Sequence, residues 1–480
     1  MNEKDMLEMI SPWISDEEIF RLNAEHYVET TQCFDRIFTD GIGSDVYESG
    51  DTHGSPRVYR DFISRVGSAP FGTDRILRQI ASEYVAAHGY RNVVPHHEAP
   101  DKQTALLARD LLSHMPPGYR LYLGQSGAEA VEAGIKFTDA ARYRNNQGQR
   151  TKFIAMHGAF HGRTLGALSF SSNIVHRRGY RVAINDVISI PYPAAHPYFV
   201  WTLDRSKSPH EKSSYAIRYF DFSTYTPEQY RKEHLDPLLD QIETISTLIV
   251  EDGVQGEGGM NVGRTDLLQE LYGFCRQHGI FVMLDAVQSG IGRTGKMFAF
   301  EYANFSPDIV TLAKALSDGL PQSATICKKE LAPERSGRHS NTNGGNPFIS
   351  LVSRAVLSEI KRRNLLERVS FNGDVLRRVL KEDFADRYDV VHSARNLGYM
   401  GGIEFWNPDT RQPDPTLRDA VAKHGLENGL LLLGCGISGI RIMPPLTTSV
   451  EALVTGLNAL AYCVQKARDE VARKRATLPV

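Results

Sequence analysis

Hydrophobic residues fall into a pattern typical of alternating strands and helices over residues 82–327 of the 480-residue chain. Short apolar runs at 248–250 and 280–284 predict strands that are buried on both faces. Between them, apolar residues recur at helical spacing, at Leu267, Leu268, Leu271, Tyr272 and Cys275. Thr265 is the predicted N-cap of that helix. A strand, a helix and a second strand in this order predict a right-handed crossover and a parallel sheet.

The pattern changes on either side of this region. Residues 1–80 lack strong periodicity, and we expect them to pack on a smaller domain or on a partner subunit. Residues 81–330 are predicted to form a large domain, and 331–480 a smaller, mainly helical one with strands at 388–391, 400–405 and 439–443. The polar, irregular segment 204–225 is predicted to be an exposed insertion.

Composition excludes several classes of function. Lys and Arg number 55 against 57 Asp and Glu, so no net field attracts nucleic acid or a membrane surface. No stretch approaches the roughly 18 apolar residues of a membrane span, and the polar N-terminus is unlike a signal peptide. The 5 cysteines form no CxxC pair, so neither a disulfide framework nor a metal site is indicated. We therefore expect a cytoplasmic enzyme.

Two charged residues each close an apolar run. Asp285 follows 280–284, and Lys314 follows 309–313, 29 residues later. A charge at the end of a buried strand costs free energy unless it has a partner or a chemical role. Taken singly, Asp285 could cap a neighbouring helix and Lys314 could be a solvated strand end.

A glycine-containing turn gives this pair a chemical meaning. The predicted strand 120–123 leads through residues 124–130 into a helix that reaches about residue 143. A strand that enters a helix through glycines can form a phosphate cradle, although an ordinary tight turn would look the same. A phosphate-bearing pyridine aldehyde needs a lysine for a Schiff base and a carboxylate that keeps its ring nitrogen protonated.

Six ordered motifs, from about Ile76 to the C-terminus, resemble the class III aminotransferases, which use pyridoxal 5'-phosphate. The motifs are 126–130 (the family's SGAEA), 158–164 (GAFHGRT), 252–259 (EPVQGEGG), 285–295 (DEVQTGxGRTG), 342–347 (TxxGNP) and 441–446 (RxxPPL). The resemblance implies an α/β fold of the aspartate aminotransferase-like fold type I. Its mostly parallel central sheet would be flanked by helices in a cofactor-binding domain over 81–330, next to a smaller α+β domain.

The resemblance also implies a role for each cofactor-site residue. Lys314 would form the Schiff base and carry the proton, and Asp285 would pair with the pyridine nitrogen. The other cofactor-binding residues would be Ser126, Gly127, Ala128, Phe160, His161, Val287 and Gln288. Thr342 would reach the phosphate of the neighbouring subunit in a homodimer with shared active sites. Packing roles for Phe160 and Thr342 are the alternatives.

Two departures from the family pattern concern support rather than chemistry. Ala286 replaces a glutamate, and strand alternation turns this position away from the ring. Asp252-Gly253 replaces Glu-Pro, which keeps a carboxylate but loses the fixed backbone angle of proline.

Three further residues address the substrates. By resemblance, Arg163 and Arg441 would bind carboxylates, and Glu257 would pair with Arg441 when a donor lacks an α-carboxylate. Packing or subunit contacts are the alternative for Arg163 and Glu257. We expect ping-pong transfer of an amino group between an amine or ω-amino acid and a 2-oxo acid, with glutamate and 2-oxoglutarate as one pair. A racemase or epimerase on the same fold, and a cofactor-binding protein without catalysis, are the alternatives.

Overall fold

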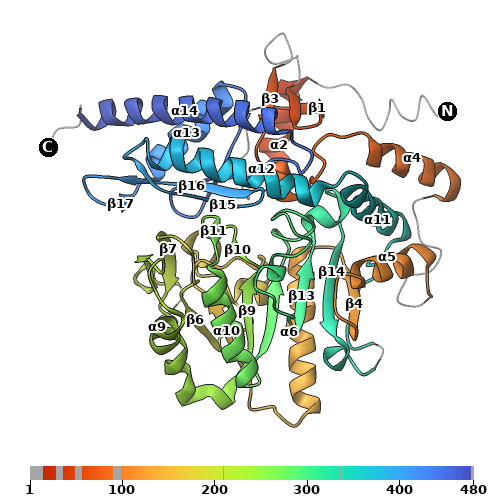
Figure 1. Cartoon of the computed structure of the whole chain (residues 1–480). Coiled ribbons are helices and arrows are strands. Elements are labelled where there is room, and N and C mark those ends of the chain that lie inside the picture. Colours follow the sequence, from red (N-terminus) through yellow and green to blue (C-terminus); the bar gives the residue numbers. More distant parts are fainter. Residues whose placement is uncertain are drawn as a thin grey trace.

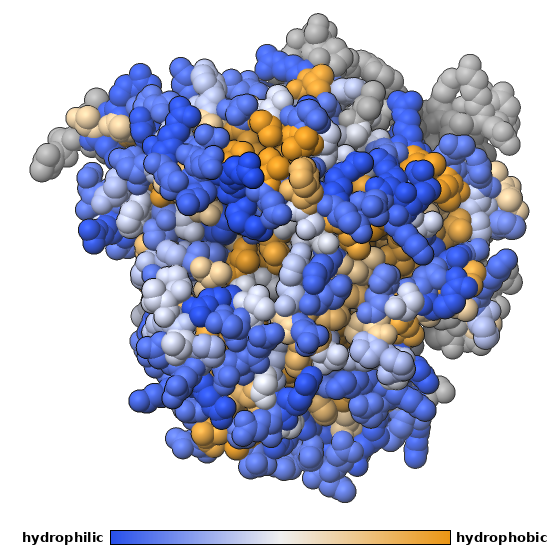
Figure 2. All heavy atoms as spheres, in the orientation of Figure 1, coloured by the Kyte–Doolittle hydropathy of each residue, from blue (hydrophilic) through white to orange (hydrophobic). Residues whose placement is uncertain are grey.

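A computed structural model describes residues 15–26, 28, 36–48, 57–89, 99–208, 210–335 and 337–476. Its described helices of eight or more residues are α2 (Asp16–His26), α4 (Ile76–His88), α5 (Lys102–Leu112), α6 (Gly127–Arg144), α10 (Thr265–Gln277), α11 (Pro347–Arg362), α12 (Leu365–Val379), α13 (Pro415–Glu427) and α14 (Val450–Ala476). None of the described helices is long and apolar enough to cross a membrane. Figure 2 shows a largely hydrophilic surface on the face that it presents.

A seven-stranded sheet forms the lower half of the molecule (Figure 1). Its order is β4 (Tyr119–Gly124), β14 (Ser323–Lys328), β13 (Ile309–Leu312), β12 (Phe281–Asp285), β9 (Ile245–Glu251), β5 (Lys152–Met156) and β6 (Val187–Ile190). Strands β13, β12, β9, β5 and β6 are parallel, and β14 runs antiparallel to both of its neighbours. The mostly parallel sheet predicted from the sequence is confirmed.

The predicted crossover joins β9 to β12 through α10. These two strands are parallel neighbours, with Asp285 opposite Glu251 in the register. The predicted N-cap at Thr265 is wrong, because Thr265 is the first helical residue and Arg264 occupies the cap without a side-chain bond. The N–H of Arg264 donates to Pro193 O (2.8 Å), which holds the chain extended one residue before the helix starts.

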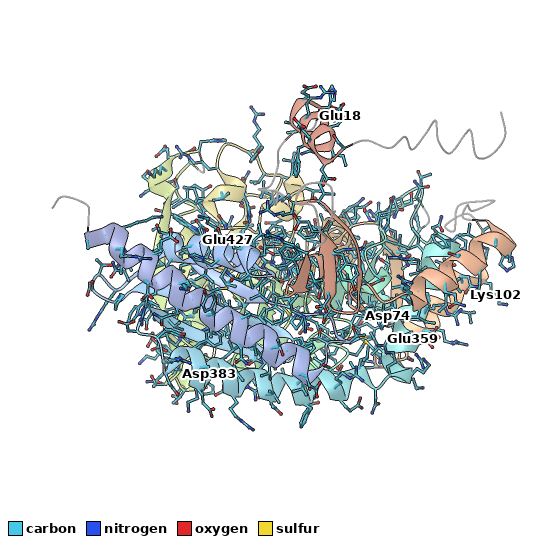
Figure 3. The ribbon with its side chains drawn as sticks, turned by 90° about the horizontal axis from the view of Figure 1, so that it is seen from above. Glu18, Asp74, Lys102, Glu359, Asp383 and Glu427 are labelled. Carbon is cyan, nitrogen blue, oxygen red and sulfur yellow. The ribbon has the colours of Figure 1, made fainter. Side chains whose placement is uncertain are left out.

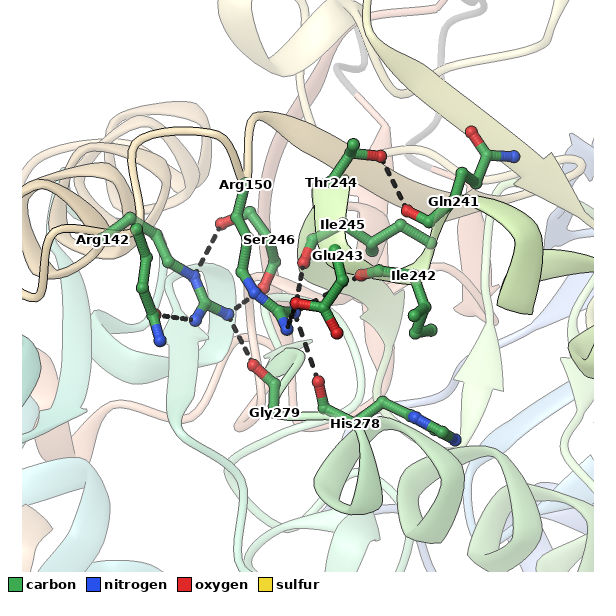
Figure 4. A network of polar contacts seen from close by, with 11 residues as sticks. Arg142, Arg150, Gln241, Ile242, Glu243, Thr244, Ile245, Ser246, His278 and Gly279 are labelled. Atoms are coloured by element: carbon green, nitrogen blue, oxygen red, sulfur yellow. Dashed lines mark hydrogen bonds and ion pairs between the residues drawn. The ribbon is translucent and has the colours of Figure 1, made fainter.

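Two buried arginines tie the strand starts together at the edge of the sheet where β9 and β12 begin (Figure 4). Arg142 of α6 donates to Ser246 O (2.6 Å) and Gly279 O (2.7 Å). Arg150 donates to Ile245 O (3.0 Å) and His278 O (3.2 Å). These bonds give additional donors to backbone carbonyls at and just before the two strand starts, and they fix the sheet at this edge.

The upper half holds a second sheet, of β15 (Val391–Leu397), β16 (Met400–Asn407), β20 (Gly439–Ile442) and β19 (Leu433–Cys435), all antiparallel (Figure 1). The strands predicted at 400–405 and 439–443 are confirmed. The strand predicted at 388–391 is wrong: β15 starts at Val391, and Tyr388 N donates to Phe384 O (3.0 Å) in the turn after a helical segment. Tyr388 and Val390 pack into the core from this turn, so the apolar pattern at 388–391 reflects buried turn residues and not a strand.

The described part of the N-terminal segment lies against the C-terminal third. Strands β1 (Phe38–Ile42), β2 (Asp45–Glu48) and β3 (Val58–Asp61) form a sheet, and β3 pairs in parallel with β18 (Leu430–Leu431). Asp74, just before α4, lies beside α11 (Figure 3) and accepts a bond from Arg363 (2.5 Å). Residues 1–14, 27, 29–35 and 49–56 of the predicted segment fall outside the described residues. The boundaries at 80 and 330 stay a prediction.

A β-hairpin occupies most of the segment predicted to be an irregular insertion. Strand β7 (Tyr198–Leu203) pairs with β8 (Tyr215–Phe220) in antiparallel register. The prediction of an irregular segment at 204–225 is therefore wrong for β8. Tyr215 (8% exposed) and Phe222 (2%) pack inward, because the aromatic residues of this polar segment supply the apolar face that a hairpin needs.

Candidate active site

A cavity of about 300 Å³ opens at the carboxyl ends of β9, β12 and β13, next to the first turn of α6. Loop and strand-end positions at this edge are the usual place for ligands in open α/β sheets. The cavity brings together ten of the predicted site residues: Ser126, Gly127, Ala128, Phe160, His161, Glu257, Asp285, Val287, Gln288 and Lys314.

Lys314 reaches the cavity from a strained position. Strand β13 ends at Leu312, two residues before the predicted strand end, and Lys314 starts a short 3₁₀ turn with φ of +43°. A left-handed lysine costs about 1–3 kcal/mol and is typical of functional sites. Burial among protein atoms lowers the pKa of Lys314, which raises the fraction of neutral, nucleophilic amine.

Asp285 is held by three donors. Its Oδ2 lies 2.8 Å from His161 Nδ1, and its Oδ1 accepts from Val287 N (3.0 Å) and Thr311 Oγ1 (3.2 Å). The side chain is therefore fixed in orientation, with its charged end at the floor of the cavity. Ala286, the next residue, packs into the apolar core instead.

The first turn of α6 forms the other end of the cavity. Ser126 is the N-cap and forms a capping box with Glu129. The first-turn N–H groups of Gly127 and Ala128 have no acceptor within the helix, and they carry the positive end of its dipole. A Cβ on Gly127 would lie 2.9 Å from Val287 Cγ1, so only glycine leaves room for this close approach.

Glu257 and Arg441 form a bidentate ion pair at the side of the cavity. Arg441 Nη1 lies 2.7 Å from Glu257 Oε1, and Nη2 lies 2.8 Å from Oε2. Burial alone would raise the pKa of Glu257, but the Arg441 guanidinium outweighs it and holds that pKa at about 2. Arg441 is 2% exposed, so removing Glu257 would leave a buried cation whose one remaining partner among the described residues is Gly434 O (2.8 Å).

A second arginine holds the loop that carries Glu257. Arg395 donates to Gly259 O (2.6 Å) and Asn261 Oδ1 (3.1 Å), and it pairs with the buried Glu404 (3.2 Å). Arg395 and Arg441 lie opposite the same residue of β16, Gly402, in the register of the sheet. Two arginines in one row of the second sheet therefore hold one loop of the large domain.

Glu251 is a cavity residue that sequence reasoning missed. It ends β9, lines the cavity beside Asp285, and its Oε2 has no partner among the described residues. Burial, and then repulsion from Asp285, raise the pKa of Glu251 well above its usual range, which favours the protonated form. The signal was available, because Glu251 closes the apolar run 248–250 as Asp285 closes 280–284.

Asp252, the carboxylate assigned to the family motif, points away from the cavity. It is fully buried, accepts a bond from Ala299 N (2.9 Å), and burial raises its pKa to about 7. Gly253 has φ of +69°, which proline cannot adopt. The loop thus differs from a Glu-Pro turn, and Glu251 supplies the carboxyl at the cavity.

Arg441 does not itself line the cavity and reaches it through Glu257, and Arg163 and Thr342 also lie outside the lining. Both are exposed, and the Arg163 guanidinium lies 5.8 Å from the centre of the Phe160 ring. Their roles as substrate and phosphate ligands stay predictions.

The residues of the cavity fit pyridoxal 5'-phosphate. The helix start with its glycine suits a phosphate, Asp285 suits a protonated ring nitrogen, and Lys314 supplies the amine. His161 Nε2 and Gln288 Oε1 are buried polar atoms without a hydrogen-bond partner among the described residues, as expected beside a polar ligand.

Comparison with known proteins identifies the family. The profile described as Aminotransferase class-III matches residues 51–464. A probable 4-aminobutyrate aminotransferase of Bacillus subtilis is 32% identical over 70% of this chain and 72% of its own length. An alanine/serine racemase of Pyrococcus horikoshii is 31% identical over 72% of this chain and 69% of its own.

Solved structures agree on the fold. The ornithine aminotransferase of Toxoplasma gondii, described with partial occupancy of PLP, has a TM-score of 0.79 and 20% identity, and the match covers 98% of this chain and 99% of that one. This likeness confirms fold type I. The chain belongs to the class-III aminotransferase family of pyridoxal-phosphate-dependent enzymes.

Proposed function

We propose that the enzyme transfers an amino group between an amine or ω-amino acid and a 2-oxo acid, with glutamate and 2-oxoglutarate as one pair. The observation that supports this most is the Glu257–Arg441 pair beside the cavity. An arginine that is neutralised by a mobile carboxylate can serve a donor without an α-carboxylate. The same arginine can bind glutamate when the carboxylate moves aside.

The residues of the cavity divide the chemistry between them. When bound, pyridoxal 5'-phosphate supplies an aldehyde and an electron-withdrawing ring. Lys314 Nζ, whose pKa burial lowers, would take the proton from the substrate carbon that bears nitrogen and release it again. Asp285, held in place by His161, would favour a proton on a pyridine nitrogen bound beside it. Glu251 lies beside Asp285, and its raised pKa favours the neutral form of this second carboxyl.

Racemisation of an amino acid is the second candidate, because one relative is named an alanine/serine racemase. It begins with the same proton removal. A racemase returns the proton to the same carbon and has no need to alternate between substrates with and without a carboxylate at Arg441. The bidentate pair therefore favours transfer.

We also propose a homodimer in which Thr342 completes the phosphate site of the neighbouring subunit. Thr342 is exposed and lies outside the cavity of its own chain, which supports a role in the partner's site.

The test is a half-reaction. Holoenzyme mixed with L-glutamate should lose its aldehyde-form absorbance and release one equivalent of 2-oxoglutarate per site. Lys314→Ala should abolish this change, while Lys329→Ala, on the surface, should not. Release of D-glutamate without 2-oxoglutarate, or no reaction with glutamate and with a panel of amines, would refute the proposed transfer.

A further inference from the structure

A second cavity lies outside the active site. It has a volume of about 460 Å³ and is enclosed by the edge strand β6, residue His157 after β5, and the hairpin β7–β8. It shares no lining residue with the catalytic cavity. The hairpin is the segment that the sequence pattern marked as an insertion, and neither the cofactor nor the proposed transfer gives it a role.

Cationic side chains dominate the wall of this second cavity. Arg205, Lys207 and Arg218 line it, and Asp204 is its one acidic lining residue. Asp204 is already engaged, with Oδ2 3.4 Å from Lys207 Nζ and Oδ1 bonded to Ser206 Oγ (2.6 Å). Three positive charges against one negative charge leave the wall with a net charge of about +2.

The two arginines have only neutral partners or none. Arg205 donates from Nε to Ser189 Oγ (2.8 Å) and from Nη1 to Ser169 O (3.0 Å), and its Nη2 has no partner among the described residues. Arg218, on β8, is exposed and forms no ion pair within the described part of the chain. The buried Nη2 of Arg205 is removed from water without a counter-charge, which costs free energy that an entering anion would recover, whereas Arg218 presents its charge to that anion from an exposed position.

Further charges behind the wall strengthen its field. Arg177 is 3% exposed; it donates to Leu168 O (2.9 Å) and Ser169 O (2.8 Å) and also has a side-chain contact with Tyr215. Burial, and then repulsion from Arg177, lower the pKa of Arg205 to about 9. Burial, and then repulsion from Arg205 and Arg218, lower the pKa of His157 to about 4. The acidic groups at or beside this wall are Asp204, which is paired with Lys207, and Glu211, whose Oε2 accepts a bond from Ser213 Oγ (3.3 Å).

We propose that this cavity binds the phosphoryl group of a small phosphorylated molecule. A phosphomonoester carries about −1.5 to −2 charges at pH 7, which matches the net charge of the wall. Arginine forks suit phosphate oxygens, and the two arginines of the wall, Arg205 and Arg218, can supply such forks. The volume lies within the range of about 300–1,000 Å³ that small-molecule sites occupy, so it is large enough for more than the phosphoryl group alone.

Calorimetric titration of the holoenzyme with sn-glycerol 3-phosphate tests the proposal, at constant ionic strength. In the holoenzyme the phosphate cradle at α6 is filled, so the signal reports other sites. We expect saturable binding of one molecule per chain and none with glycerol. Loss of one charge-assisted contact should weaken binding about 10- to 100-fold in Arg218→Gln. Arg378→Gln, the same charge change on the exposed face of α12, should leave binding unchanged.

Three outcomes would overturn the proposal. The first is no saturation by about 10 mM sn-glycerol 3-phosphate. A site with a Kd of about 1 mM, or a binding free energy of about −4 kcal/mol, would be nearly saturated at that concentration. The second is equal weakening in Arg218→Gln and Arg378→Gln, which would indicate general charge attraction. The third is binding that Arg218→Gln leaves intact, which would place the anion elsewhere. Because Arg218 is exposed, its replacement should leave the fold and the transfer reaction unchanged.

Discussion

Replacing Glu257 by glutamine should separate the two kinds of substrate. The change keeps the size of the side chain and removes its charge, so the 2.7 and 2.8 Å contacts to Arg441 lose their ionic character. Two unit charges about 4 Å apart interact by about 4 kcal/mol at an effective dielectric of 20. Breaking a buried pair by removing one partner costs about 3–5 kcal/mol. Arg441 would then meet every substrate with its charge uncompensated.

A donor without an α-carboxylate gains nothing from that free charge, whereas glutamate supplies its own carboxylate. We therefore expect kcat/KM for an ω-amine donor to fall by about 100-fold, equivalent to about 3 kcal/mol, in Glu257→Gln. The value for L-glutamate should stay constant or rise, because glutamate no longer has to displace Glu257. Single-turnover absorbance with each donor measures the ratio.

The control variant is Glu367→Gln, the same change at an exposed position of α12, which should alter neither value. Equal losses for both donors would refute the reasoning, because they would show that Glu257 supports the fold of the site rather than the choice of substrate.

Three further predictions concern stability and cofactor binding. The pKa of Asp252 is about 7 in the folded protein, against an ordinary value of 3.8. Asp252 therefore makes its full contribution to stability, up to about 4 kcal/mol, only below about pH 4, and this contribution is lost as the pH rises to 7. Asp252→Asn should remove this loss, so urea midpoints of the two proteins should differ more at pH 8 than at pH 5. Arg395→Met should cost about 3–5 kcal/mol in chemical denaturation by leaving Glu404 (1% exposed) unpaired. Gly127→Ala should weaken cofactor affinity, measured by titrating the apoenzyme, because its Cβ would lie 2.9 Å from Val287 Cγ1.

Each of these has an outcome that contradicts it. An unchanged pH slope in Asp252→Asn would mean that Asp252 is not the group that titrates. Arg395→Met combined with Glu404→Leu should recover much of the stability, and no recovery would show that lost packing dominates. Val287→Ala should restore affinity to Gly127→Ala if contact with Val287 is the cause.

The sequence predicts best where a residue breaks its local pattern. Asp285 and Lys314 stand out because a charge closes an apolar run, and the structure places both at one cavity. The same reasoning would have found Glu251, but the motif drew attention to its neighbour Asp252. Strand β8 was missed because its burial pattern is irregular, with one buried residue at its start and mostly exposed ones after it.

Contacts between distant segments are beyond such reasoning. Arg395 is 136 residues from Gly259, and nothing local predicts that the two meet. The pairing of β3 with β18 also depends on how the chain returns, which no periodicity encodes. The left-handed φ of Lys314 likewise follows from its surroundings and not from its own preference.

The row formed by Arg395, Gly402 and Arg441 has a consequence for motion. The loop around Glu257 follows β9 of the seven-stranded sheet, yet two groups bind it from the C-terminal part of the chain. These are Arg395 of β15 and, in the turn between β19 and β20, Gly436 N, which donates to Glu257 O (2.8 Å). Any swing of the C-terminal sheet must carry the loop with it or break these bonds. Closure of the site around a substrate and the choice between substrates with and without a carboxylate would then be one coordinated movement. Amide exchange in residues 256–262 should therefore slow together with exchange in β16 and β20 when a dicarboxylate binds.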